Sequence, residues 1–180
     1  MTIEETKLKG CVLIKPDVYE DERGYFFESF NANVLGDRKI NLNFVQDNQS
    51  FSSYGTVRGL HLQKGDHAQA KLVRVLSGEV LDVAVDLRKN SPTFGKHFSI
   101  ILTAENHKQL FVPRGFAHGF LVLEDNTTFN YKCSEYYDKP SERAILWNDN
   151  TLNIDWQIKT PIISKKDKIA ENFANFVTPF

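Results

Sequence analysis

The feature that most constrains the fold is strict alternation of apolar and polar residues in the middle of the chain. In 81–87 every second residue is leucine or valine, and the residues between them are Asp82, Ala84 and Asp86. A period of two is that of a β-strand, because successive side chains point to opposite faces. The segment is therefore predicted to form a strand with one buried face and one polar face.

Further segments have the composition of strands, being rich in valine, isoleucine, phenylalanine and tyrosine. They are 71–77, 97–103, 109–112, 119–123 and 127–134. Turn residues such as Ser77-Gly78 and Pro113-Arg114-Gly115 separate them. Closely spaced strands without helical periodicity between them favour an all-β antiparallel sandwich or barrel, and we expect a jelly roll. Helical patterns occur only in 27–36 and 168–177, which are expected to form short peripheral helices.

Composition narrows the class of protein. The chain has 180 residues and no shift in composition, so a single domain over 1–180 is expected. Lys and Arg total 22 against 23 Asp and Glu, a net charge of -1, which gives no electrostatic reason to bind nucleic acid or an anionic membrane. The two cysteines lack the spacing of a zinc or disulfide framework. The polar start and the lack of a long apolar run predict a cytoplasmic protein.

Candidate chemistry begins in the segment 56–63. If this segment is a strand, His61 and Gln63 share a face with Gly59, whose missing side chain leaves space beside them, while Arg58 points to the opposite face. Taken alone, a histidine in this setting is more often a hydrogen-bonded structural residue. Arg58 could reach the same side as His61 only if the strand bends or twists at Gly59.

Neighbouring strands supply matching polar groups. Lys71 shares a face with inward valines, where an unpaired ammonium would be costly to desolvate, although its tip could instead reach water at the mouth of the strand. Tyr131 shares a face with Phe129 and could be a core tyrosine with a satisfied hydroxyl. His118 lies where a turn enters a strand, and it could be an ordinary loop histidine.

Metal-binding cupin jelly rolls usually place two histidines one residue apart on a strand, followed by a carboxylate and a later histidine. Here His61 is followed by Leu62 and Gln63, so the second ligand is missing, and no metal site is expected. Histidine, lysine and tyrosine together suit proton transfer.

Several motifs carry a family resemblance over about residues 10–170. They are Asp21-Glu22-Arg23-Gly24-Tyr25-Phe26-Phe27-Glu28, Gln46-Asp47-Asn48, Arg58-Gly59-Leu60-His61, Ala68-Gln69-Ala70-Lys71-Leu72-Val73, Ser91-Pro92-Thr93-Phe94-Gly95, Gly115-Phe116-Ala117-His118-Gly119-Phe120, Tyr131-Lys132-Cys133 and Trp147-Asn148-Asp149. In this order they resemble the dTDP-4-dehydrorhamnose 3,5-epimerase family, and so many matched blocks are far more specific than a lone pattern.

The resemblance implies a double-stranded β-helix jelly roll, cupin-like, that forms a homodimer and uses neither a metal nor an organic cofactor. The implied reaction converts dTDP-4-dehydro-6-deoxy-D-glucose to dTDP-4-dehydro-L-rhamnose. The family's catalytic base matches His61 and its acid matches Tyr131. Its active-site lysine falls on Lys71, and the carboxylate that pairs with the base falls on Asp167.

The resemblance also implies the substrate contacts, a dTDP-linked 4-keto-6-deoxyhexose being the expected partner. A second histidine that contacts the substrate matches His118, and an aromatic ring that stacks on thymine matches Tyr137. Nucleotide and diphosphate contacts fall on Arg23, Glu28, Gln46, Asn48, Arg58, Glu142 and Lys166. The chain departs from the family at Leu62, often a tyrosine, and at 64–66, where the loop often carries proline.

The sequence leaves three alternative functions open. A relative that inverts only C3 or only C5 of another dTDP-4-keto-deoxysugar would use the same groups. A non-catalytic jelly roll that binds sugar nucleotides would have no need for His61, Lys71 and Tyr131 together, and a metal-dependent oxygenase would need ligands that are missing. The sequence also leaves open whether Arg23 serves its own subunit's site or a neighbour's.

Overall fold

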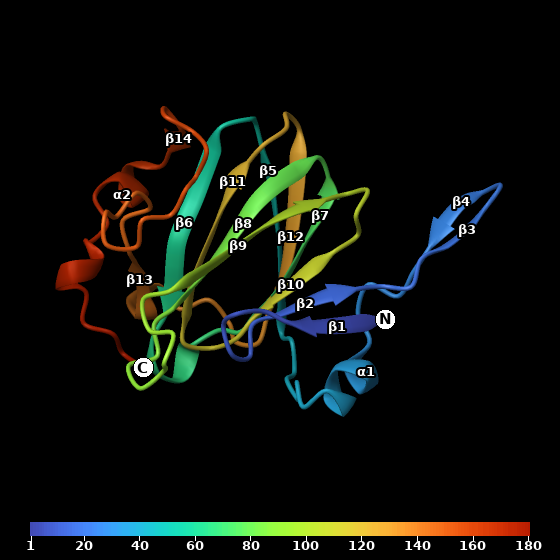
Figure 1. The fold of residues 1–180 in the computed structure, drawn as a ribbon, viewed down its shortest axis with the longest axis horizontal. Helices are drawn as coiled ribbons and strands as arrows, with labels where there is room; N and C mark the ends of the chain where they lie inside the picture. Colours follow the sequence, from blue (N-terminus) through green and yellow to red (C-terminus); the bar gives the residue numbers. More distant parts are fainter.

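The computed structural model describes residues 1–180, which form two facing β-sheets (Figure 1). The first sheet is antiparallel and has the order β1-β2-β10-β7-β12-β5. Its strands are β1 (Thr2–Glu5), β2 (Val12–Lys15), β5 (Gln46–Ser52), β7 (Lys71–Ser77), β10 (Gln109–Val112) and β12 (Thr127–Cys133). The predicted cupin-like jelly roll is confirmed.

The second sheet has the order β13-β6-β11-β8-β9, with the short strand β14 parallel to β6. Its strands are β6 (Thr56–Gln63), β8 (Glu79–Asp86), β9 (His97–Thr103), β11 (Phe116–Val122), β13 (Glu142–Ala144) and β14 (Ile162–Ile163). Strands β7, β9 and β10 coincide with the segments predicted from composition, and β11 and β12 differ from them by a few residues at their ends. β-Branched and aromatic residues therefore located these strands correctly.

The main core lies between the two sheets. Val73 and Val75 of β7 and Phe129 of β12 pack there against Phe116 and Phe120 of β11. All five side chains are buried.

A second apolar cluster covers the outer face of the second sheet. The C-terminal segment lays Leu152, Trp156 and Phe173 against side chains such as Val83 and Val85 of β8. The alternation in 81–87 was thus interpreted correctly as a strand, but its polar face is not exposed: Asp82 and Asp86 are fully buried. The reason is that the sheet is covered on both sides, so the polar positions of β8 face the barrel interior or a hydrogen-bond network.

Helical structure is sparse, and neither α-helix has the length and apolar character needed to cross a membrane. Helix α1 (Ala32–Asp37) overlaps the predicted 27–36 and starts later, because the Asn31 side chain accepts hydrogen bonds from the amides of Asn33 and Val34. The predicted helix 168–177 is wrong. Helix α2 (Lys165–Lys168) ends there, and only a 3₁₀ turn follows at Phe173–Asn175.

The physical reason for that error is tertiary pairing. The backbone carbonyl of Glu171 accepts a hydrogen bond from Leu146, and Ile145 bridges to Glu171 in parallel. Phe173 and Phe176 then pack on the second apolar cluster. Contacts with the sheet therefore replace the internal hydrogen bonds of a helix.

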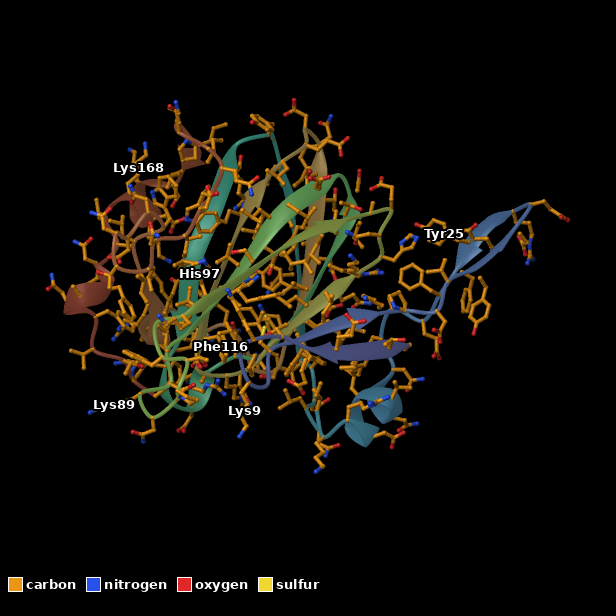
Figure 2. The ribbon with its side chains drawn as sticks, in the orientation of Figure 1. Lys9, Tyr25, Lys89, His97, Phe116 and Lys168 are labelled. Carbon is orange, nitrogen blue, oxygen red and sulfur yellow. The ribbon has the colours of Figure 1, made fainter.

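A two-stranded hairpin leaves the body of the protein near the N-terminus. Strands β3 (Tyr19–Asp21) and β4 (Gly24–Phe26) project away from the sheets (Figure 1). Figure 2 shows Tyr25 on this arm, and its ring centroid lies 4.6 Å from that of His107 on the loop before β10. Tyr19, Tyr25 and Phe26 are all more than half exposed. The arm buries little of its aromatic surface within the chain.

Candidate active site

A cavity of about 470 Å³ opens between the two sheets, and the C-terminal segment forms part of its rim. This volume is in the usual range for small-molecule sites. The residues that line it come from β5, β6, β7, β11, β12, β14 and α2: Ser50, Thr56, Val57, Arg58, His61, Lys71, His118, Phe120, Tyr131, Ile162, Ile163, Ser164, Lys166 and Asp167. Residues widely separated in sequence thus meet in one chamber.

His61 and Asp167 form a hydrogen-bonded pair at the edge of this cavity. The imidazole Nε2 lies 2.7 Å from Asp167 Oδ1. Asp167 is buried, whereas the His61 side chain is 31% exposed toward the cavity. With Nε2–H donated to the carboxylate, Nδ1 of His61 is the nitrogen left free to accept a proton.

Helix α2 holds the carboxylate in place. Ser164 caps the helix and accepts a hydrogen bond from the Asp167 amide at 3.1 Å. Burial disfavours the charged form of Asp167. The hydrogen bond with His61, the charge of that imidazole when it is protonated, and hydrogen bonding with Ser164 and the Gly59 backbone outweigh that cost and hold the Asp167 pKa below its ordinary value. The carboxylate therefore stays ionised behind the imidazole.

Arg58 lines the same cavity as His61, although simple alternation along β6 places them on opposite faces. The pairing of β6 with β11 explains this. His61 of β6 pairs with His118 of β11, and Arg58 of β6 pairs with Phe120 of β11. An advance of three residues along β6 therefore corresponds to only two residues along β11. This bulge returns Arg58 to the cavity side.

The bulge also depends on glycine. A Cβ on Gly59 would lie 2.5 Å from Gly119 Cα, which is closer than real Cβ contacts occur. The two backbones can approach this closely only because neither position carries a side chain. Arg58 is then held by Ser52, whose Oγ accepts hydrogen bonds from Arg58 Nε and Nη2 at 3.2 and 3.1 Å. The condition stated for Arg58, a bend or twist of the strand at Gly59, is met by this bulge.

Lys71 and Tyr131 lie together on the opposite wall from the C-terminal segment. The Lys71 ammonium is 5.6 Å from the centre of the Tyr131 ring. Both residues line the cavity, and on each strand the next inward residue toward the core, Val73 or Phe129, is buried. The predicted facing of both strands is confirmed.

Burial shifts the ionisation of both groups. It lowers the pKa of the Lys71 ammonium, an effect that the negative groups around it only partly offset. It raises the pKa of the Tyr131 phenol. The phenol is therefore protonated at neutral pH and can donate a proton, while the lysine is easier to discharge than a free one.

A second His–Asp pair lies beside the first. His118 Nε2 is 2.9 Å from Asp82 Oδ2, and both side chains are buried. His118 is the direct cross-strand neighbour of His61. The sequence singled out His118 but not its partner Asp82, which looked like one more polar residue of an alternating strand. Two imidazoles, each backed by a carboxylate, thus meet at one end of the cavity.

Ser50 is a further residue that the sequence did not single out. Its hydroxyl oxygen lies in the wall of the cavity, is buried, and has no hydrogen-bond partner within the protein. A buried hydroxyl is normally paired, so this one is available to a bound molecule. Alternation along β5 could have placed Ser50 on the side of Asn48, but not shown that its hydroxyl lacks a partner.

A smaller cavity of about 250 Å³ adjoins the first and shares His61, Lys71 and Tyr131 with it. Its remaining lining residues are Gln46, Asn48, Leu62, Gln63, Gln69, Tyr137 and Glu142. The Tyr137 hydroxyl donates to Glu142 Oε2 at 3.0 Å, and Lys166 forms an ion pair with Glu142 Oε1. The structure thereby brings together the predicted site residues except Arg23 and Glu28.

Those two residues lie outside both cavities. Arg23 is at the tip of the projecting hairpin, where it pairs with Asp21. Glu28 follows the hairpin and accepts a hydrogen bond from Asn31 Nδ2 at 3.1 Å. Neither reaches the cavities of its own chain.

No three His, Cys, Asp or Glu side chains converge in a group that could hold a metal ion. The chemistry offered by the cavities is that of hydrogen-bond donors, an ammonium, a phenol and two imidazole–carboxylate pairs. Such a set can move protons and can bind anions.

Comparison with known proteins agrees with this arrangement. Residues 5–175 match the family model described as dTDP-4-dehydrorhamnose 3,5-epimerase. The chain belongs to this family. It is therefore related to epimerases, which are isomerases. The family match covers both walls of the cavity and the C-terminal segment that carries Asp167.

Individual members of the dTDP-4-dehydrorhamnose 3,5-epimerase family are similar over nearly their whole length. The enzyme of Shigella flexneri is 48% identical over 178 residues, which is 97% of each chain. The crystal structure of the enzyme from Elizabethkingia anophelis has 54% identity and a TM-score of 0.92, covering 97% of each chain.

A third relative was solved with a bound sugar nucleotide. It is the dTDP-6-deoxy-D-glucose-3,5-epimerase of Legionella pneumophila in complex with dTDP-4-keto-L-rhamnose. Its identity to this chain is 44% and the TM-score is 0.93, with 98% of this chain and 94% of that one covered. The family's fold is thus reproduced throughout.

Proposed function

We propose that this protein converts dTDP-4-dehydro-6-deoxy-D-glucose to dTDP-4-dehydro-L-rhamnose by inverting C3 and C5 through metal-free acid–base catalysis. The observation that carries the proposal is that an imidazole backed by a buried carboxylate, a phenol and an ammonium line a single cavity of about 470 Å³. Family membership makes a 4-keto sugar nucleotide the expected substrate.

The chemistry requires groups on two sides of the sugar ring. A ketone at C4 acidifies the C–H bonds at C3 and C5, because the resulting carbanion delocalises onto the ketone oxygen as an enolate. Inversion then requires a proton to leave from one face and another to arrive on the opposite face. A single residue cannot easily serve both faces.

His61 and Tyr131 supply the two groups. His61 Nδ1 takes the proton from carbon, and Asp167 stabilises the imidazolium that forms. Tyr131, whose pKa burial raises, then gives its phenolic proton to the same carbon from the other face. Solvent restores the phenol and receives the proton from the imidazolium. The cycle repeats at the second carbon.

Lys71 and His118 act on the enolate oxygen. The Lys71 ammonium lies close to Tyr131 and is recessed in the cavity, where a hydrogen bond to developing negative charge is strong. His118 is held by Asp82 and can donate to the same oxygen from its free side when protonated. Positioned acid–base groups typically contribute about 10²–10⁴-fold, so stabilisation of the enolate supplies a large share of the remaining acceleration.

The rest of the cavity suits a nucleoside diphosphate. Arg58 and Lys166 are cationic groups on the lining and suit the diphosphate. Tyr137 offers an exposed aromatic ring for thymine, and Gln46, Asn48 and Glu142 lie around it. The proposed reaction needs no organic cofactor, because one side chain accepts the proton that leaves each carbon and another donates the proton that replaces it.

We further propose that residues 1–180 form one domain that functions in the cytoplasm as a homodimer. In this arrangement the projecting hairpin brings Arg23 and Glu28 to the cavity of a second subunit. Its exposed aromatic residues, which pack little within the chain, support this role. Equal activity of Arg23→Ala and wild type, or a monomer that retains full activity in light scattering, would contradict it.

The roles of the two catalytic groups can be tested separately by NMR of substrate in D₂O. His61→Ala should abolish exchange at both C3 and C5, whereas Tyr131→Phe should retain exchange and lose net inversion, because enolate formation precedes reprotonation. His67→Ala is a suitable control, since His67 is exposed on the 3₁₀ turn Gly65–His67 and lies outside the cavities. Near wild-type exchange in His61→Ala would remove it as the base.

The same experiment separates the rival functions. Inversion at only one carbon would indicate a mono-epimerase of another deoxysugar, which uses the same side chains. Binding of dTDP without any exchange would indicate a sugar-nucleotide-binding protein without activity.

A further inference from the structure

Tyr137 lies on a loop that makes few buried apolar contacts with the rest of the protein. Residues 135–138 follow β12, and the side chains of Tyr136 and Tyr137 are 64% and 53% exposed. Loops with few buried apolar contacts open easily. A mobile loop would be a poor platform for an aromatic ring, so the backbone of this loop requires another source of order.

Three glutamine side chains provide it. They come from β5, from β6 and from the segment just before β7. Gln69 Nε2 donates to the carbonyl of residue 135 at 2.8 Å, and Gln63 Nε2 donates to that of residue 136 at 3.1 Å. The amide of residue 137 donates to Gln46 Oε1 at 2.9 Å, and that of residue 138 to Gln63 Oε1 at 2.7 Å. Four consecutive residues are each held through one backbone group.

Both N–H groups and the oxygen of the Gln63 side-chain amide form hydrogen bonds. Its second N–H bond goes to the carbonyl of His67 at 2.8 Å, which ties a further loop to the same point. The partners fix the orientation of this amide, because a backbone N–H can only meet the oxygen and carbonyls can only meet the nitrogen. Gln63 is 4% exposed, so no water can replace these bonds at low cost.

Gln46 is engaged at both ends as well. Its oxygen accepts from the amide of Tyr137, and its nitrogen donates to Asn48 Oδ1 at 2.9 Å. In this arrangement Gln46 supports the backbone of Tyr137.

We propose that Gln46, Gln63 and Gln69, here named the glutamine clamp, are positioning residues that fix the Tyr137 ring so that it can stack on the pyrimidine of the nucleotide. The inference rests on the proposed function, since it assigns a role to the nucleotide end of the same site. A platform ordered in advance costs less to order upon binding, so the clamp contributes to nucleotide affinity. It leaves proton transfer at the sugar unaffected, because no member of the clamp is a proton donor or acceptor in that step.

Gln63→Glu is the sharpest perturbation. The substitution keeps shape and volume but replaces the NH2 group, which donates both N–H bonds, by one carboxylate oxygen that faces two carbonyl oxygens. Gln157→Glu is the matched control, since Gln157 is exposed and its side chain makes no hydrogen bond. Thermal unfolding of both variants shows whether the fold survives, and Gln69→Glu, which breaks a single partly buried bond, is the milder substitute if Gln63→Glu does not fold.

Hydrogen exchange tests the clamp directly. In Gln63→Glu the carbonyls of residues 136 and 67 lose their N–H donors and face a carboxylate oxygen instead, so the loop should open more often. The amides of Tyr137 and Asp138 should then exchange at least about tenfold faster than in wild type, because lost buried hydrogen bonds of this kind are worth about 1–3 kcal/mol. Unchanged exchange would overturn the clamp, whatever the protein binds.

Measurements of nucleotide binding test whether the glutamine clamp contributes to affinity. Calorimetric Kd for dTDP and the KM for the sugar nucleotide should rise about tenfold or more in Gln63→Glu. The kcat and the Kd for inorganic pyrophosphate should stay within about threefold of wild type, a level at which binding differs by less than 1 kcal/mol. Equal losses for dTDP and pyrophosphate, or a fall in kcat alone, would refute the inference.

A double-mutant cycle with Tyr137→Ala decides whether the clamp acts through the ring. If it does, Gln63→Glu should lower dTDP affinity in wild type and have almost no effect once the ring is removed. Additive losses would overturn the proposed role of the clamp. Failure of wild type to bind dTDP would instead overturn the proposed function, while the exchange rates would still report on the clamp.

Discussion

Replacing Asp167 with asparagine tests the assignment of His61 as the base most directly. The change preserves the shape of the side chain and removes the charge that lies 2.7 Å from the imidazole. The Ser164 cap is retained because it involves the backbone amide of residue 167. The experiment therefore separates electrostatic support of the imidazolium from the local fold of helix α2.

The magnitude follows from the geometry. Two unit charges about 4 Å apart interact by about 4 kcal/mol at an effective dielectric constant of about 20. The imidazolium is only partly formed in the transition state, so about 2–4 kcal/mol should be lost, which corresponds to a roughly 30- to 1,000-fold fall in kcat. KM should change much less, because the carboxylate lies behind His61.

The assay is the rate of solvent deuterium incorporation at C3 and C5 under saturating substrate. Asp155→Asn is the control, since Asp155 is exposed and also accepts a hydrogen bond within the C-terminal segment. A kcat for Asp167→Asn within about threefold of wild type, less than 1 kcal/mol of the barrier, would refute the reasoning.

Two pH dependences follow from the ionisation of buried groups. Burial lowers the pKa of Lys71 and raises that of Tyr131, so kcat should fall as pH rises through the lowered pKa of Lys71. Lys71→Arg should move this alkaline limb of the pH profile to higher pH. A limb that stays in place would assign it to another group. Burial opposes ionisation of Asp86, but hydrogen bonds from Arg88, Ser91 and Thr93 outweigh it and hold the Asp86 pKa at about 2. The resulting stability is present above the ordinary pKa near 3.8 and is lost as pH falls toward 2. Asp86→Asn should thus cost about 1–2 kcal/mol in urea unfolding at pH 7, after allowance for screening, and a difference that persists at pH 2 would contradict this.

Local sequence patterns, namely strand composition and period-two alternation, predicted much of the fold. Strands such as β7 and β9 were predicted residue for residue, because their β-branched and aromatic residues fit a pleated, half-buried surface. Period-two parity also placed Lys71 and Tyr131 in the interior. Both inferences depend only on neighbours along the chain.

What depended on distant segments was missed or only partly foreseen. The helix expected at 168–177 is absent because Glu171 bonds to the backbone of Leu146. Alternation along β8 could not show that Asp82 is buried. The C-terminal segment, far along the chain, covers the apolar face of β8, so the face that carries Asp82 is turned to the interior. The position of Arg58 required a bulge set by Gly59 and Gly119.

The origin of Asp167 has a consequence for the living cell. Its hydrogen-bond partner His61 lies 106 residues earlier in the sequence, on a strand that can form long before the carboxylate is synthesised. A ribosome-bound chain that stops short of helix α2 would carry a histidine without its carboxylate. The pairing of this histidine with its carboxylate is thus withheld until residue 167 has been synthesised and helix α2 can fold.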